Sequence, residues 1–444
     1  MLVPYLFKGD GPPMMDAKLT IWCTLVLTFI GSGVTGQKLK FNYDESQVPS
    51  YSLPDLLITN DGAKVANRRQ WERIRRPEVV DLFTVHMFGR VPVNVDNNLR
   101  FKVLESGLIL QGRARRLQVR LFFNQKQENP FVDVLIYLPI VATRREACPM
   151  FVGLNFMGNH TITNDPLVHI TKSWVRNKAD IGYQNNQASL ESRGTSAQRW
   201  PIELLINSGF GLATAYYGDI DPDFDDGFNN GVHALYPKGD HSDGHQWGSI
   251  ATWSWGLSRI LDYLEKLEVV NPEQIGVIGH SRLGKTSLWA GATDQRFAVV
   301  ISNDSGCGGA ALSRRKFGET VQRINTSFPH WFCNKFQDYN ANEDALPVDQ
   351  HMLIALIAPR PVYIASASED LWADPVGEFL SGRLAQPVYD LYGVSGLSEL
   401  VNPEPNQPVG DHVAYHLRKG KHNLLEYDWR QYIEFAKRHY THNK

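Results

Sequence analysis

The sequence predicts an α/β fold in which a mostly parallel central sheet is covered by helices on both faces, a three-layer αβα sandwich. Short apolar runs of strand length alternate with segments whose apolar residues recur at helical spacing, the pattern of parallel strands connected through helices. No internal repeat, heptad pattern or low-complexity tract interrupts it. The 444 residues, 43% hydrophobic and 21% charged, suffice for one large domain with insertions.

Strand and helix candidates follow one another along the chain. Apolar residues at helical spacing predict helices over 67–88, 247–267 and 425–439, and another helix is expected from Thr286. The expected strands are Leu99–Leu104, Leu117–Phe123, Phe131–Ile140, Met150–Met157, Phe210–Tyr216, 275–278, Phe297–Ser302, Pro361–Ser366 and Val413–Leu417. A polar insertion occupies 162–198. The acidic segment 219–226 is expected to be a solvated loop, with a calcium site as the alternative.

The N-terminus has the features of a secretory signal. Lys18 precedes the apolar stretch 19–30, and small residues over 31–36 follow it. We therefore expect a signal peptide over 1–36, with translation starting at Met14 or Met15. An N-terminal lead-in over 37–95, exposed over 38–75, would then pack on a catalytic domain over 96–444. The apolar stretch is short for a membrane span, so the mature protein is expected to be secreted or periplasmic and free of the membrane, with an uncleaved anchor as the alternative.

Charge and cysteine content exclude several other classes. A formal net charge of −2 does not favour a nucleic-acid partner. After signal removal Cys148, Cys307 and Cys333 remain, and the sequence favours one disulfide, Cys307–Cys333. No C-x-x-C or H-E-x-x-H pattern is present, so a zinc site is not expected. We expect a monomer that needs no metal and no organic cofactor.

The most informative segment reads I-G-V-I-G-H-S-R-L-G-K over 275–285. An apolar strand runs into Gly279, Ser281 follows at a sharp turn, and a helix begins after Gly284. Such a turn raises a serine hydroxyl above the sheet edge, where backbone N–H groups at the helix start face an incoming anion. In the usual pattern, G-x-S-x-G, the second glycine comes one residue earlier. Arg282, beside the serine, could donate to a developing oxyanion.

Polar residues at later strand ends could complete a catalytic triad with Ser281. In the α/β-hydrolase architecture the nucleophile, the acid and the histidine follow in that order at the carboxyl ends of strands. Asp304 follows one expected strand, Glu369 and Asp370 follow the next, and His422 follows the last. A serine hydroxyl needs such a base, and a carboxylate would hold the imidazole in the correct tautomer. His160 could instead belong to an oxyanion loop.

These motifs resemble the glucuronoyl esterases, carbohydrate esterase family fifteen. The run G-H-S-R-L-G-K over 279–285 is similar to the family signature G-C-S-R-x-G-K, and N-D-S-G-C-G-G over 303–309 is similar to the segment that holds an alternative acid. Segments 318–321, 330–333, 357–360 and 372–375 resemble the bacterial branch. His280 replaces a disulfide-forming cysteine of fungal members. Asp304 replaces a glutamate, and its shorter side chain favours Asp370 as the triad acid, with sharing between the two left open.

The resemblance implies a substrate and a role for each residue. The substrate would be an ester of the C6 carboxyl of 4-O-methyl-glucuronic acid in glucuronoxylan, linked to a lignin alcohol. Ser281 would attack the carbonyl, His422 would transfer the proton, and Arg282 would hold the oxyanion. Lys285 and Glu319 would bind sugar hydroxyls, and Trp372 would cover the sugar ring. The alternatives are an acetyl-xylan or other carbohydrate esterase on the same fold and a catalytically silent polysaccharide-binding relative.

Overall fold

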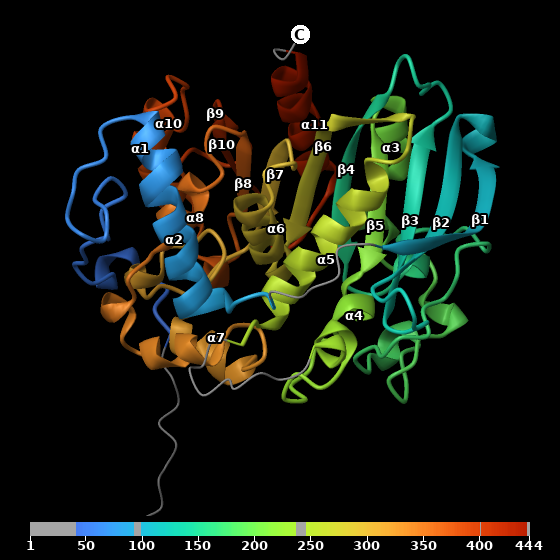
Figure 1. Ribbon diagram of the computed structural model, residues 1–444, viewed down its shortest axis with the longest axis horizontal. Coiled ribbons are helices and arrows are strands. Elements are labelled where there is room, and N and C mark those ends of the chain that lie inside the picture. Colours follow the sequence, from blue (N-terminus) through green and yellow to red (C-terminus); the bar gives the residue numbers. More distant parts are fainter. Residues whose placement is uncertain (1–40, 93–98, 237–245, 400, 442–444) are drawn as a thin grey trace, which may run out of the picture. The chain divides into compact units, whose positions relative to one another are not determined.

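Ten strands form one twisted sheet at the centre of the protein (Figure 1). The computed structural model describes residues 41–92, 99–236, 246–399 and 401–441, which fall within one compact unit, Phe41–Lys444. The strands are β1 Arg100–Ile109, β2 Ala114–Phe122, β3 Phe131–Pro139, β4 Cys148–Asn155, β5 Gly211–Tyr216, β6 Val270–His280, β7 Val299–Asn303, β8 Val362–Ala367, β9 Val409–Gly410 and β10 Val413–Arg418. Their order across the sheet is β1-β2-β3-β5-β4-β6-β7-β8-β10-β9.

The predicted parallel sheet is confirmed at the centre and extended by antiparallel edges. Strands β5, β4, β6, β7, β8 and β10 pair in parallel. Strands β1, β2 and β3 form an antiparallel meander, and β3 joins β5 antiparallel. Short β9 pairs antiparallel with β10 at the other edge. Because the central strands are parallel, the loops after β6, β7, β8 and β10 meet at one edge of the sheet.

Helices cover both faces of the sheet. They are α1 Arg68–Gln70, α2 Arg76–Phe83, α3 Ile202–Asn207, α4 Tyr217–Ile220, α5 Ser249–Leu264, α6 Arg282–Thr293, α7 Val321–Ser327, α8 Gln350–Ala355, α9 Pro375–Leu384, α10 Gln386–Asp390 and α11 Glu426–Thr441. Alternate residues of β3 divide between two cores: Val134 and Ile136 join α2, α5, α6 and α8, whereas Leu135 joins α3 and α11. Successive side chains of a strand point to opposite faces, so β3 is buried on both sides of the sheet. The sheet and the helices on its two faces form the predicted three layers.

The expected helix over 67–88 is confirmed, although its winding varies. Segments α1 and α2 alternate with two π-helical stretches, Trp71–Arg75 and Thr84–Phe88. Trp71 and Phe83 are fully buried in the same core as α5 and α6, so the chain before β1 contributes to the core. Leu56, within the stretch expected to be exposed, is also buried. The signal expected over 1–36 and its alternative starts lie outside the described residues.

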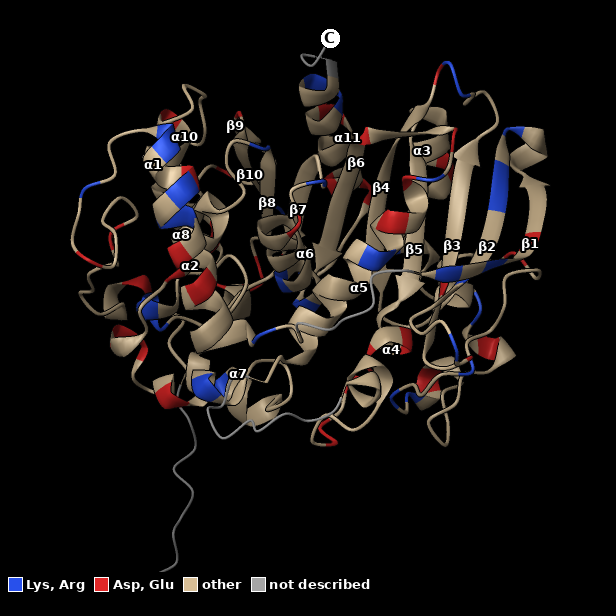
Figure 2. Ribbon diagram, in the orientation of Figure 1, with Lys and Arg blue, Asp and Glu red and all other residues tan. Residues whose placement is uncertain are grey.

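Charged residues of both signs lie along the continuous helical stretch from α1 to α2, residues 68–83 (Figure 2). Arg68, for example, pairs with Glu72 at 2.8 Å on an exposed face. This local balance accords with the low net charge of the whole chain. Among the described helices, none has both the length and the apolar character needed to cross a membrane.

The expected disulfide is wrong. Cys148, Cys307 and Cys333 are all buried free thiols. The Cys333 Sγ lies 3.6 Å from the Val85 carbonyl oxygen, in the layer of helices before β1. Cys307 lies after β7, where burial and then the charge of Glu319 raise the pKa of its thiol well above the usual value, against the charge of Lys285. Each cysteine is therefore a buried free thiol, and burial rather than a disulfide keeps it from reacting.

Candidate active site

Ser281 lies at a strained turn between β6 and α6. Its backbone φ of 56° and ψ of −130° fall where residues with a side chain are rarely found. A Cβ at Gly279 would lie 1.7 Å from the Leu283 carbonyl oxygen, and one at Gly284 would lie 2.9 Å from the Ser305 Cβ. The first glycine therefore lets the helix start fold back on the strand, and the second lets the helix approach the loop after β7. The predicted strand–turn–helix is confirmed, with the late glycine explained by this close approach.

His422 and Asp370 come together at the same edge of the sheet. The His422 Nδ1 lies 2.6 Å from the Asp370 Oδ2. The loops that carry them are joined by a hydrogen bond from the Glu369 backbone N–H to the Gly420 carbonyl oxygen, at 2.8 Å. Asp370 is buried, whereas the Glu369 side chain is exposed. Of the two acids after β8, Asp370 is thus the one whose carboxylate orients the imidazole.

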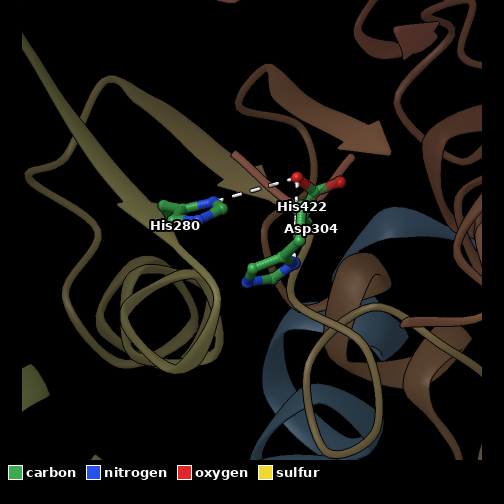
Figure 3. A group of neighbouring side chains, drawn as sticks. All are labelled: His280, Asp304 and His422. Atoms are coloured by element: carbon green, nitrogen blue, oxygen red, sulfur yellow. Dashed lines mark ion pairs between the residues drawn. The ribbon is translucent and has the colours of Figure 1, made fainter. Parts of the chain in front are cut away.

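Asp304 lies near His422 but is held by other partners. Its Oδ2 is 4.0 Å from the His422 Nδ1 and accepts the Asn423 backbone N–H at 3.2 Å. In Figure 3 dashed lines join the Asp304 carboxylate to both His280 and His422. Burial, together with the charges of Glu378 and Asp370, raises the pKa of Asp304 well above its usual value. A carboxyl that tends to stay neutral is poorly suited to stabilise an imidazolium, so the geometry and the charge both favour Asp370.

His280 packs against His422 directly beside Ser281. The two ring centroids are 4.5 Å apart. The His280 Nδ1 lies 2.6 Å from the Asn303 Oδ1, and the Asn303 Nδ2 donates to the Tyr432 hydroxyl at 3.0 Å. Because the amide oxygen can only accept, His280 carries its proton on Nδ1. Burial and then the charge of His422 hold the pKa of His280 well below its usual value, so the ring stays neutral.

The trio of His280, Asp304 and His422 (Figure 3) has donor atoms within 4.8 Å of one another, close enough to be considered as a metal site. The His280 Nδ1 carries a proton towards Asn303, and the His422 Nδ1 is bonded to Asp370. These nitrogen lone pairs are therefore not free for a metal. His280 and Asp304 are buried side chains that lie against the more exposed His422 ring.

Ser281 and His422 open into one cavity of about 400 Å³. The loop after β4 contributes Phe156 and Met157, and the insertion contributes a second wall that begins at Val175. The remaining lining residues are Arg176, Asn177, Lys178, Tyr183, Arg199, Tyr216, Tyr217, His280, Arg282 and Phe328. Four of the lining side chains are Lys or Arg, and none of the lining residues that the structure describes is Asp or Glu. The cavity is therefore suited to negative charge on a reacting group or product.

Arg282 projects into this cavity from a cage of aromatic rings. Its guanidinium carbon lies 4.7 Å from the Trp331 ring centroid, 5.5 Å from that of Phe156 and 5.7 Å from that of Phe328. Its Nη1 donates to the Asp223 Oδ2 at 2.6 Å. Its Nε is shielded from water and has no hydrogen-bond partner in the described structure. An unpaired buried donor beside the serine is available to a substrate oxygen.

Asp223 is the principal residue of the site that the sequence did not indicate. It is fully buried and also receives hydrogen bonds from the Tyr217 hydroxyl at 2.9 Å, the His330 Nε2 at 2.9 Å and the Trp331 Nε1 at 2.7 Å. Burial by itself would raise the pKa of Asp223, but the bond from His330 and the charge of Arg282 outweigh burial and hold it well below its usual value. Asp223 is thus a permanent anion that orients Arg282.

The expectation that 219–226 is a solvated loop is wrong for its first half. Asp219 and Asp221 are also buried; the Asp221 Oδ1 lies 3.1 Å from the His233 Nδ1. The partners of these acids come from distant segments, so the acidic composition of the loop gave no local sign of burial. An indirect sign was the neighbouring pair His330 and Trp331, because ring N–H groups need a hydrogen-bond acceptor when they are buried.

The expected sugar contacts form a second group beside the cavity. The Glu319 backbone N–H donates to the Trp372 carbonyl oxygen at 3.0 Å, and the Lys285 ammonium donates to the Ser305 carbonyl oxygen. Burial raises the pKa of Glu319, and the charge of Lys285 opposes this rise. Lys285 is buried rather than on a solvated helix face. None of the three residues is among the described lining of the cavity.

His160, the alternative oxyanion-loop residue, is fully buried and lies outside the described lining of the cavity. Its Nε2 lies 2.8 Å from the Ser192 Oγ, so the ring joins the loop after β4 to the insertion. Burial lowers its pKa to about 4. These observations are those of a neutral structural histidine.

Comparison with known proteins places this site in a family. A family model of fungal glucuronyl esterases matches residues 229–393. A solved glucuronoyl esterase from Solibacter usitatus is 43% identical, with a TM-score of 0.83, and the match covers 89% of this chain and 100% of that one. A solved promiscuous CE15 esterase from a marine bacterial metagenome is 53% identical, with a TM-score of 0.85, over 90% of this chain and 100% of that one.

This chain belongs to the glucuronoyl esterases, carbohydrate esterase family fifteen. A curated relative from Schizophyllum commune, a 4-O-methyl-glucuronoyl methylesterase, is 37% identical over 77% of this chain and 74% of that protein. The esterase is a carboxylic ester hydrolase, and its likeness to the two bacterial structures agrees with the bacterial-type motifs in its sequence. The predicted α/β-hydrolase fold is confirmed by the same likeness.

Proposed function

We propose that this esterase hydrolyses esters of the C6 carboxyl of glucuronic acid, including its 4-O-methyl form, and cleaves ester links between glucuronoxylan and lignin alcohols. The observation that carries the proposal is that Ser281, Arg282 and His422 line one cavity while Asp370 holds the His422 imidazole at 2.6 Å. Membership of the family supports the uronate class of substrate. The two glucuronoyl esterases compared above are named for that class of ester.

The proposed reaction proceeds through an acyl-enzyme. The Ser281 oxygen forms a bond to the ester carbonyl carbon while His422 takes the hydroxyl proton, and the Arg282 Nε donates to the oxygen that becomes negative. Collapse of this intermediate breaks the bond to the alcohol, which leaves with the proton from His422. Water then attacks the acyl-enzyme by the same route, which releases the uronate and restores Ser281. Asp370 keeps the imidazole in the tautomer that accepts at Nε2.

The positive charges around the cavity suit the carboxylate product of ester hydrolysis. Hydrolysis turns a neutral ester into a carboxylate, which the basic residues Arg176, Lys178 and Arg199 would attract. We place the sugar ring between this cavity and the group of Lys285, Glu319 and Trp372, as family resemblance suggests. Charge from both Arg282 and Lys285 acts on the Glu319 carboxylate, which supports a common binding region.

We further propose that the chain acts outside the cytoplasm as a monomer, after removal of a signal over 1–36. The polysaccharide substrate lies outside the cell, which agrees with the basic and apolar start of the sequence. The lead-in over 37–95 and the catalytic domain over 96–444 would then form the mature enzyme. Neither nucleic acid nor membrane is a proposed partner.

Comparison of ester substrates tests the proposed specificity. Purified enzyme should hydrolyse benzyl glucuronate with a kcat/KM at least about 100-fold above that on benzyl acetate, because only the uronate can use contacts made beyond the carbonyl. Acetate release from acetylated xylan should stay near background. A preference for either acetyl substrate would favour the acetyl-xylan esterase alternative, and binding of xylan without turnover of any ester would favour the silent relative.

Replacing Asp223 with asparagine should lower kcat on benzyl glucuronate about 10- to 100-fold and change KM little. The neutral amide removes the anion that orients Arg282, and loss of one oxyanion donor reduces kcat by roughly 10²–10³ in other hydrolases. Asp225→Asn, a matched change at an exposed position of the same loop, should retain activity. An equal rise in KM with unchanged kcat would contradict a role in the transition state.

A further inference from the structure

We propose that Asp411, His412 and His439 form a binding site for a transition-metal dication, with zinc the best match to its ligands. Asp411 and His412 immediately precede β10, and His439 lies in the last turn of α11. The three side chains are therefore at the amino-terminal edge of the parallel strands, opposite the edge that carries Ser281 and His422. This site is separate from the proposed catalytic machinery.

The donor atoms are nearly in place for a metal. The His412 Nδ1 lies 3.4 Å from the Asp411 Oδ2, and the His439 Nε2 lies 3.8 Å from the Asp411 Oδ1. One ligand atom from each residue falls within 4.8 Å of the other two. Ligands about 2.1 Å from a tetrahedral zinc ion are about 3.4 Å apart, so small side-chain rotations would complete three coordination bonds.

The backbone holds two of the ligands in position. The Asp411 and His412 backbone N–H groups donate to the Gly396 and Ser395 carbonyl oxygens at 3.2 and 2.9 Å. The His412 carbonyl oxygen accepts from the Val362 N–H at 2.8 Å, which continues the pairing with β8. A site anchored to the sheet in this way loses little backbone freedom on binding a metal.

The two imidazoles supply the other two ligand atoms of the site. The His412 Nδ1 is shielded from water and has no hydrogen-bond partner in the described structure. The His439 Nε2 donates to the Asp411 carbonyl oxygen at 3.3 Å, so a metal bond at this nitrogen would replace that hydrogen bond, with the ring proton moving to Nδ1. Two imidazoles and one carboxylate are the ligand set of many zinc sites.

The surroundings leave room for a fourth ligand and carry mixed charge. The trio borders a cavity of about 720 Å³ whose charged lining residues are Glu265, Glu273, Arg296, Arg360 and Arg438. Arg296 is paired with Asp294, Asp262 and Glu265, and Arg360 donates to backbone carbonyl oxygens. The positive charge of Arg438 opposes a nearby cation, whereas the negative charge of Glu273 favours one. A water molecule from the cavity could occupy the open position.

A bound ion would join the end of α11 to the loop before β10. Since the ion would bind the folded chain and not the unfolded one, it should raise the melting temperature. It should leave ester hydrolysis unchanged, because the proposed site and Ser281 are at opposite edges of the sheet.

Zinc titration of the untagged mature protein tests the proposal. Isothermal titration calorimetry should give one site with a Kd below about 10 μM, and saturating Zn²⁺ should raise the melting temperature without changing kcat on benzyl glucuronate. His439→Ala and the milder Asp411→Asn should each weaken zinc binding at least tenfold and remove the thermal shift. His169→Ala, at an exposed histidine elsewhere, should change neither.

Three results would overturn the site: no binding at 100 μM zinc, binding that survives both variants, or binding that inhibits ester hydrolysis in wild type and variants alike. The last result would place the ion on the histidines near Ser281. Should His439→Ala fail to fold, Asp411→Asn decides, because its backbone hydrogen bonds remain. Substitution of Co²⁺ for Zn²⁺ gives a second measurement, with visible absorption expected for nitrogen and oxygen ligands and lost in Asp411→Asn.

Discussion

Ser281→Ala should lower kcat/KM on benzyl glucuronate by about 10⁴- to 10⁶-fold, the loss found when the nucleophile of a serine hydrolase is removed. Alanine keeps the turn but has no oxygen to form the acyl-enzyme. Background hydrolysis from Arg282 and substrate positioning alone would account for the remaining rate. The rate is measured by following benzyl alcohol release at several enzyme concentrations.

The controls for this substitution concern folding and binding. Ser281 is partly exposed, and its backbone N–H bond to the Asn303 carbonyl oxygen, 2.8 Å long, does not involve the side chain. Melting temperature should therefore change little, and the variant should still bind glucuronate. Activity within tenfold of wild type would refute Ser281 as the nucleophile, and a silent wild-type protein would leave only the polysaccharide-binding alternative.

Asp370→Asn should lower kcat by about 10⁴-fold, as loss of the triad carboxylate does in other serine hydrolases. The Asp370 Oδ2 is 2.6 Å from the His422 Nδ1 and fixes the proton on that nitrogen. An amide could present its NH₂ group instead, which favours the wrong tautomer and leaves the imidazolium without a counter-charge. We expect KM to change much less than kcat, because the lost interaction grows as His422 becomes charged.

Asp304→Asn is the matched comparison for this second substitution. Its Oδ2 lies 4.0 Å from the same nitrogen, and burial with neighbouring carboxylates already raises the pKa of Asp304 well above its usual value. A loss of tenfold or less is therefore expected. A larger loss for Asp304→Asn than for Asp370→Asn would reverse the assignment, and modest losses in both single variants with a large loss in the double variant would indicate shared work.

The order of the chain predicted much of this fold and its site. Apolar runs between helical segments predicted the central strands, since a strand buried on both faces must be apolar at nearly every position. Gly279 and Gly284 predicted a sharp turn at Ser281, because residues without a side chain let the strand and the following helix approach closely. Parallel strands bring their carboxyl ends to one edge, so residues as distant as Ser281, Asp370 and His422 were expected together from strand ends alone.

Local sequence could not predict contacts made between distant segments. Cys307 and Cys333 looked like a pair until their separate environments were known. Asp223 reads as part of a solvated acidic loop, yet donors from Tyr217, Arg282 and residues 330–331 enclose it.

The sequence by itself therefore predicted the order of the central strands, the sharp turn at Ser281 and the candidate acids. Only the tertiary structure decided that Asp370 rather than Asp304 holds His422, and that a buried anion orients Arg282. The physical reason is that hydrogen bonding and pKa depend on distances of a few ångströms and on burial. Both are set by how remote segments pack and not by the spacing of residues along the chain.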